Sequence, residues 1–219
     1  MKMGTVIALT GRKGGIGKST ITGNLAGELV AMGWTVRVLD TDPQQSLCQW
    51  AKLGQGLLSR VTAAVETAHP EQFQRAVEAA KATAQVVLVD TPPAFADPAL
   101  LAALLADVVL LPASPSPLDI MAAQEALELV QEAQRQRGGQ KPIIRFVPSR
   151  LMSRTVLSHD LPQTLAALGA PVLPGITQRT VVAEAALVGL TVAEYAKNSL
   201  ARAEFKALAS ALWEILHDH

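Results

Sequence analysis

A glycine-rich stretch at residues 11–20 reads Gly-Arg-Lys-Gly-Gly-Ile-Gly-Lys-Ser-Thr and directly follows a short apolar run. Its glycines would let successive backbone N–H groups approach phosphate oxygens at the start of a helix. Lys18 could then neutralise the outer phosphates, and the Ser19 hydroxyl could bind Mg²⁺. The stretch therefore predicts a nucleoside-triphosphate site built from Gly14, Gly15, Ile16, Gly17, Lys18, Ser19 and Thr20.

This stretch departs from the common phosphate-loop pattern at one position. The usual first glycine of Gly-x-x-x-x-Gly-Lys-[Ser/Thr] would fall at Arg12, and a second lysine, Lys13, follows it. A glycine cluster between a strand and a helix can also serve close packing alone. Packing does not require the Gly-Lys-Ser-Thr sequence that follows, so a phosphate site remains the favoured interpretation.

Two carboxylates, Asp40 and Asp42, stand at alternate positions after a second apolar run. Such a pair near a strand end can face one Mg²⁺–phosphate site or hold the water that attacks the terminal phosphate. A turn capped by aspartate before a helix is the alternative, and Pro43 suits it equally well.

A third acid, Asp90, ends the run Val86–Val89. A buried strand that delivers an acid to the Mg²⁺ shell has this form. One apolar run ended by aspartate is common by chance, whereas three such loops in the right order are not. We therefore expect Ser19 and Asp90 to serve the metal.

Apolar runs rich in β-branched residues alternate with helical patterns along the chain, which predicts an α/β fold with a doubly wound, mostly parallel sheet flanked by helices. Ligands of such sheets lie outside the carboxyl ends of the strands, where the three loops fall. The expected strands are Thr5–Leu9, Thr35–Leu39, Val86–Val89, Val108–Leu111, Ile143–Val147 and, weakly, Val172–Leu173. Helices should begin near Gly17, Gln45, Pro70, Asp97, Leu118, Ser158, Thr180 and Ser199.

The composition limits the possible classes. A chain of 219 residues, 49% of them apolar, fits one domain over residues 1–219. Its 19 basic and 19 acidic residues balance, so any polyanionic partner must meet a local patch. The single cysteine, Cys48, excludes intramolecular disulfides and indicates a cytoplasmic protein, and no apolar stretch has the length of a membrane span.

The run Lys13–Ser19 matches without departure the pattern Lys-Gly-Gly-x-Gly-Lys-[Ser/Thr] of the ParA/MinD family of deviant Walker-A ATPases, and the chain resembles that family. The resemblance implies that Lys13 reaches the partner's nucleotide across a dimer interface, while Lys18 serves its own. It also implies that Asp42 positions the attacking water, which makes Lys13, Lys18 and Asp42 the expected catalytic residues. Asp40 would support the metal, and Thr91, Pro92 and Pro93 would form switch II.

Further along, the proline-rich segment 111–119 and residues 176–179 look like parts of the small ParF-type plasmid-partition proteins. This resemblance implies an ATP-dependent homodimer that binds DNA non-specifically, associates with the nucleoid and positions a plasmid, a chromosome region or a protein body. An activating ParB-like or cargo-adaptor protein would stimulate its slow hydrolysis of Mg-ATP. Residues 147–150 are a candidate for adenine contacts. The expected DNA-binding cations are Arg179, Arg202 and Lys206, to which Arg150 and Arg154 could add.

Other functions occur on the same family core. A MinD-like regulator of a membrane surface would use an amphipathic last helix, and the stripe Phe205, Leu208, Leu212, Trp213 and Leu216 has that spacing. Such a stripe is more often the core-facing side of a helix. An ATP-dependent metabolic ligase remains open, although Lys13 favours the dimerising branch. Cys48 and Tyr195, each the only residue of its type, exclude a cluster-bearing electron carrier and a kinase with a tyrosine-rich tail.

Overall fold

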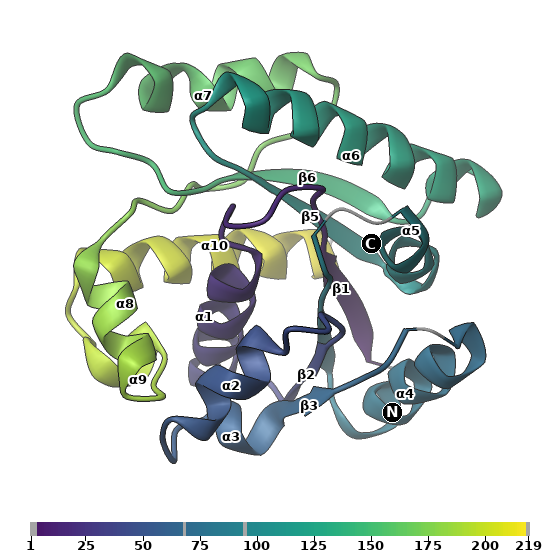
Figure 1. Cartoon of the computed structure of the whole chain (residues 1–219), viewed down its shortest axis with the longest axis horizontal. Coiled ribbons are helices and arrows are strands. Elements are labelled where there is room, and N and C mark those ends of the chain that lie inside the picture. Colours follow the sequence, from purple (N-terminus) through teal and green to yellow (C-terminus); the bar gives the residue numbers. More distant parts are fainter. Residues whose placement is uncertain (1–3, 68, 94–95, 218–219) are drawn as a thin grey trace.

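The computed structural model describes residues 4–67, 69–93 and 96–217. Six parallel strands form one sheet in the order β3-β2-β4-β1-β5-β6 (Figure 1). One of the two central strands is β1, which pairs with β4 and β5. Its carboxyl end leads into the glycine-rich loop. The strands are β1 (Thr5–Leu9), β2 (Val36–Asp40), β3 (Thr62–Ala64), β4 (Val86–Asp90), β5 (Val108–Ala113) and β6 (Ile143–Pro148).

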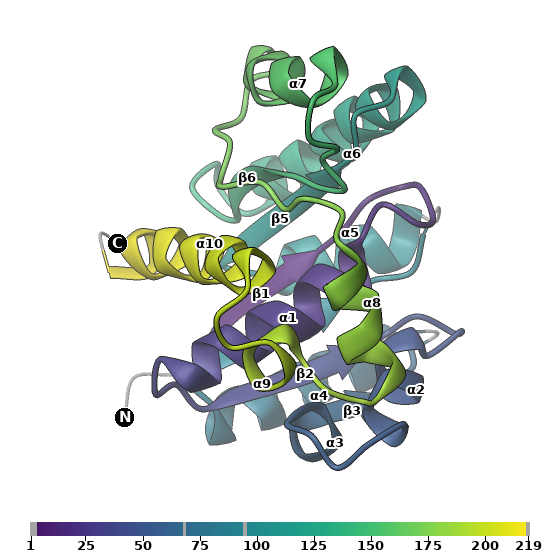
Figure 2. The ribbon, with the colours of Figure 1, turned by 90° about the vertical axis from the view of Figure 1, so that its left-hand side faces the viewer.

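Helices cover both faces of the sheet (Figures 1 and 2). Side chains alternate between the faces along each strand, so Ile7 and Leu9 point into one core while Val6 and Ala8 point into the other. The first face packs against α1 (Lys18–Ala31), α2 (Ser46–Lys52), α3 (Leu58–Val61), α8 (Thr180–Leu187), α9 (Val192–Tyr195) and α10 (Leu200–His217). The second packs against α4 (Pro70–Thr83), α5 (Ala96–Leu105), α6 (Pro117–Gln136) and α7 (Val156–Ala167).

The predicted α/β architecture is confirmed, and each expected helix start lies within two residues of an observed one. The expected strand at Val172–Leu173 is wrong, because this segment makes only a single parallel bridge, between Phe146 and Val172. Pro171 and Pro174 flank it, and proline lacks the N–H that a longer ladder needs. The strand that the sequence analysis did not predict is β3, a short edge strand that contains no apolar run.

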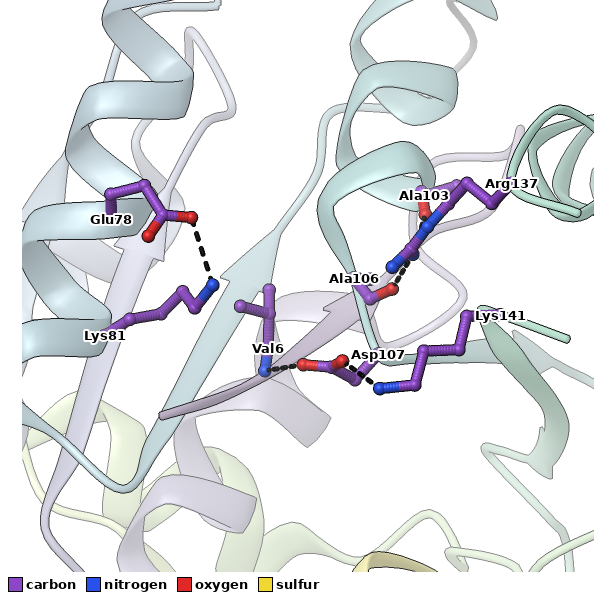
Figure 3. A network of polar contacts seen from close by, with 8 residues as sticks. All are labelled: Val6, Glu78, Lys81, Ala103, Ala106, Asp107, Arg137 and Lys141. Atoms are coloured by element: carbon purple, nitrogen blue, oxygen red, sulfur yellow. Dashed lines mark hydrogen bonds and ion pairs between the residues drawn. The ribbon is translucent and has the colours of Figure 1, made fainter. Parts of the chain in front are cut away.

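Polar contacts connect the strands at the amino-terminal end of the sheet, opposite the glycine-rich loop (Figure 3). One oxygen of the Asp107 carboxylate accepts the N–H of Val6 at 2.9 Å, and the other pairs with Lys141 at 2.7 Å. The Arg137 guanidinium donates to the carbonyl of Ala106 at the end of α5. These contacts tie β1, β5 and β6 together near their amino ends.

Candidate functional site

The glycine-rich loop connects β1 to α1 and forms an open cradle of backbone donors. Gly15 and Gly17 have φ of +77° and +94°, a region in which other L-residues are strained. In the described part of the chain, the N–H groups of Gly14, Gly15, Ile16 and Gly17 make no hydrogen bond of good geometry. Free N–H groups at the start of a 14-residue helix favour an anion, so the loop fits a phosphate group.

Lys18 belongs to the interior of this loop. Its ammonium donates to the carbonyls of Gly11 at 3.2 Å and of Lys13 at 3.1 Å, and its side chain is buried. Burial lowers the pKa of Lys18, while the carboxylates of Asp90 and Asp42 oppose that shift. The charge therefore lies beside the cradle, where a bound phosphate would interact with it.

Lys13 points away from the same loop. Its ammonium forms an ion pair with the carboxylate of Asp119 in the first turn of α6, and 44% of its side chain is exposed. Its neighbour Arg12 pairs with Glu125 of the same helix at 2.7 Å. The two lysines of the loop thus have separate surroundings.

Asp90 ends β4 beneath the cradle and is completely buried. The Ser19 hydroxyl donates to one oxygen of its carboxylate at 2.6 Å, and the Thr22 hydroxyl lies 3.3 Å from the other. Burial raises the pKa of Asp90 to about 7, against these two hydrogen bonds. Mg²⁺ is usually bound by one or two protein oxygens together with substrate phosphates, so Ser19 and Asp90 fit a metal held with a nucleotide.

Asp40 and Asp42 lie beside this pair, since β2 aligns Asp40 with Asp90. The Asp40 carboxylate accepts N–H groups of Asp42 at 3.2 Å and Cys48 at 3.0 Å, and burial raises its pKa. The carboxylate of Asp42 is half-buried and accepts the N–H of Gln44 at 2.8 Å. Asp42 therefore caps the turn in this structure, as the alternative interpretation requires, and its role toward water stays a prediction.

The segment after Asp90 is tied to two neighbouring strands. The Thr91 hydroxyl donates to the carbonyl of Leu9 at 2.9 Å, and the Thr41 hydroxyl donates to the carbonyl of Asp90 at 2.7 Å. Thr91 and Pro92 are buried and Pro93 is half-buried, whereas residues 94–95 lie outside the described part of the chain. A change at Asp90 would therefore reach both loops that follow β2 and β4.

Several contacts of the site were not predicted from the sequence, although residues 147–150 were considered for adenine contacts. Thr22 lies one helical turn after Ser19, a spacing that could have revealed it. Asp119, Ser149 and Arg150 carry no such local signal, because they follow strands far along the chain. Ser149 and Arg150, within the segment considered for adenine contacts, donate to carbonyls of the glycine-rich loop.

The expected DNA-binding cations lie on α10 and on the segment before α8. Arg179 pairs with Glu204 at 2.7 Å, and Arg202 pairs with the buried Glu28 of α1 at 3.0 Å. Lys206 is exposed on α10, and no ion pair of its ammonium occurs among the described residues. Two of the three cations thus have protein partners, and their contact with DNA stays a prediction.

The apolar stripe of α10 is largely a core surface. Phe205, Leu208 and Leu212 are completely buried against the first face of the sheet, and only Trp213 of the stripe is well exposed. Within the described residues, none of the helices combines the length and the hydrophobicity needed to cross a bilayer. The stripe therefore cannot insert into a membrane surface unless the helix first leaves the core.

Residues 7–192 match the model of the family described as the CobQ/CobB/MinD/ParA nucleotide binding domain. The chain belongs to this family. The matched range runs from β1 to the start of α9, so it contains the glycine-rich loop and all three acids of the site.

Two relatives are similar to the chain in sequence, and two solved structures share its fold. Proteins named maintenance of carboxysome distribution protein A are 33% identical over 213 residues in Gloeobacter kilaueensis (94% of this chain, 93% of the relative) and 29% identical over 189 residues in Halothiobacillus neapolitanus (85% of each). An ATP complex of a variant of Cyanothece McdA matches with a TM-score of 0.77 and 17% identity over 99% of this chain and 98% of that one. MinD from Pyrococcus horikoshii, complexed with Mg-ADP, matches with a TM-score of 0.76 and 20% identity over 98% of each chain.

Proposed function

We propose that this chain is a ParA-type, Mg²⁺-dependent ATPase that dimerises on ATP, binds DNA non-specifically as a dimer and positions a cargo. A partner protein that stimulates hydrolysis would release it from DNA. The observation that carries the proposal is the separation of the two loop lysines, with Lys18 inside the cradle and Lys13 turned out toward Asp119.

The site supports ATP hydrolysis with named roles. Lys18 and the free N–H groups of the loop would hold the phosphates, and Ser19 and Asp90 would hold Mg²⁺. When bound, Mg²⁺ would neutralise part of the negative charge of the phosphates. Asp42 would exchange its hydrogen bond to Gln44 for one to the attacking water, which slows basal turnover because the carboxylate must first leave the turn.

In a dimer, the exposed Lys13 would contact the nucleotide of the partner. Two copies related by a two-fold axis present the same face to each other, so a side chain near the edge of one cradle can reach the other. Lys13 lies at that edge, and its ion pair with Asp119 can be exchanged for a partner's phosphate. Terminal phosphate charge favours this exchange, which makes the dimer depend on ATP.

The names of the relatives support a cargo-positioning role. Two curated relatives are named for carboxysome distribution and another is named Protein ParA, and the first name favours a protein body over a plasmid as the cargo. Because the chain carries no net charge, DNA would contact a local patch, and pairing two patches in a dimer increases the number of phosphates neutralised. ATP binding would thereby raise DNA affinity.

Three measurements on the purified protein test the proposal. We expect Mg²⁺-dependent phosphate release from ATP, a shift from monomer to dimer with ATP but not ADP, and retention of unrelated DNA duplexes only with ATP. Lys18→Ala serves as the control that lacks nucleotide in each assay. Binding to liposomes instead of DNA would support a MinD-like role, and ATP turnover that requires a small carboxylic acid would indicate a ligase.

A further inference from the structure

The loop between β6 and α7 contacts the outer side of the glycine-rich loop at two consecutive peptide groups. The Ser149 hydroxyl donates to the carbonyl of Ile16 at 2.7 Å, and this contact is buried. The Arg150 guanidinium donates to the carbonyl of Gly15 at 2.7 Å from an exposed position. The two donors therefore hold neighbouring carbonyls of the phosphate cradle from one side.

Because a peptide group is planar, holding its carbonyl also fixes the direction of its N–H group. In a trans peptide the C=O and the following N–H point in opposite directions. Holding the carbonyl of Gly15 outward aims the N–H of Ile16 inward, and holding the carbonyl of Ile16 aims the N–H of Gly17 inward. Neither of these N–H groups makes a hydrogen bond of good geometry among the described residues.

The backbone of the contacting loop is itself held in place. The N–H of Ser149 donates to the carbonyl of Ala113 in β5 at 2.8 Å, and that of Leu151 donates to Ile176 at 3.0 Å. Arg150 lies between these two fixed points with φ of +51°, in the left-handed region that a non-glycine residue rarely adopts. Such a conformation persists only where its surroundings fix it, and it is found most often at functional sites.

We propose that Ser149 and Arg150 are positioning residues that aim the N–H groups of Gly17 and Ile16 at the phosphates of a bound nucleotide. Ser149 is the fixed member, because it is buried and its hydroxyl bonds within the protein. Arg150 is the adjustable member, because its side chain is exposed. The inference rests on the proposed function only so far as the nucleotide is ATP or ADP.

The chain offers matched controls within the same loop. Ser153 is an exposed serine for which no hydrogen bond is found in the described structure. Its replacement by alanine removes the same hydroxyl group as the replacement of Ser149. Arg154 is an exposed arginine that also has a positive φ, +75°, and it matches Arg150 in charge and backbone conformation. Loss of a serine hydroxyl, a positive charge or a strained side chain is therefore controlled separately from loss of the contact.

The test compares Ser149→Ala with Ser153→Ala and Arg150→Ala with Arg154→Ala by calorimetric titration with Mg-ATP and Mg-ADP. We expect Ser149→Ala to weaken both nucleotides about tenfold, as for loss of one buried hydrogen bond, and Arg150→Ala to weaken them about threefold. Because the cradle holds ground state and transition state alike, KM for ATP should rise while kcat changes little. Both controls should bind as the unaltered protein does.

A purely structural role would lower the melting temperature without changing nucleotide affinity, and that result would overturn the inference. Nucleotide affinities of folded Ser149→Ala and Arg150→Ala within twofold of their controls would do the same. If the unaltered protein binds nucleotide but neither dimerises nor retains DNA, the proposed function fails while the titrations still decide the role of the two residues. If it binds neither nucleotide, both proposals are wrong.

Discussion

The ammonium of Lys13 pairs with the carboxylate of Asp119, 106 residues further along the chain. Asp119 is buried and also accepts a hydrogen bond from Ser114, so the acid is fixed while the lysine keeps 44% of its side chain exposed. Lys18 lies instead among the carbonyls of its own loop. One ion pair therefore separates the two lysines that the sequence places five positions apart.

Substitution of the two lysines should have different effects. Lys18→Ala removes the cation beside the cradle, and we expect nucleotide binding to become undetectable by calorimetry. Lys13→Ala removes an exposed cation whose partner is Asp119, so ATP affinity should stay within about threefold of the original because the cradle is intact. Sedimentation with ATP should show no dimer for Lys13→Ala. Equal loss of ATP affinity in both variants would contradict the separate roles.

Asp42→Ala distinguishes the two roles open to that residue. If Asp42 orients the attacking water, its removal should slow turnover by about 10²–10⁴-fold and leave a persistent ATP-bound dimer. Size-exclusion chromatography with ATP would show that dimer. If Asp42 only caps the turn by accepting the N–H of Gln44, the variant should keep its turnover. Its free energy of unfolding should instead be about 0.5–2 kcal/mol lower.

The buried Asp90 predicts a pH dependence of folding. Its folded-state pKa of about 7 lies above the ordinary carboxyl value of 3.8, so the folded protein binds a proton more tightly than the unfolded chain. The free energy of unfolding of the nucleotide-free protein should therefore fall as the pH rises from about 4 to 7. Thermal unfolding across this range should show the decline, and Asp90→Asn should remove most of it. The exposed Asp97→Asn serves as the control.

The same carboxyl group predicts proton release on binding. If Asp90 holds Mg²⁺ as proposed, it must be ionised, so Mg-ATP should displace the proton that the free site holds near neutral pH. Titrations at pH 6.5 in buffers of different ionisation enthalpy would measure that proton. Identical apparent enthalpies in all buffers would mean that Asp90 is already ionised in the free site.

Lys206 gives the cleanest test of the expected DNA patch. Lys206→Ala should reduce ATP-dependent retention of DNA and lower the slope of log affinity against log salt by about one or two, because each dimer presents two copies. Arg202→Ala confounds the same assay. It leaves Glu28 buried without its partner, and we expect it to destabilise the fold by about 1–3 kcal/mol. Arg202→Ala combined with Glu28→Gln restores a matched comparison, and unchanged retention by Lys206→Ala would place the patch elsewhere.

The phosphate loop and the three acids could be found from the sequence because each is a local signal. Glycine spacing sets the loop conformation, and an apolar run ended by aspartate places a carboxylate at the edge of a buried strand. The alternation of apolar runs with helical patterns likewise indicated the parallel sheet, since both patterns are properties of the chain itself. The short strand β3 escaped because its three residues are too few and too exposed to show a period.

The contacts between distant segments depended on the tertiary structure. Asp119 meets Lys13, Ser149 and Arg150 meet the phosphate loop, and Glu28 meets Arg202 because of which strands and helices become neighbours. The spacing of these residues in the sequence does not indicate which strands and helices become neighbours. An acid or a serine after a strand has many possible partners. Side-chain pairing across more than a hundred residues is therefore fixed by the order of strands in the sheet, not by the local sequence around either partner.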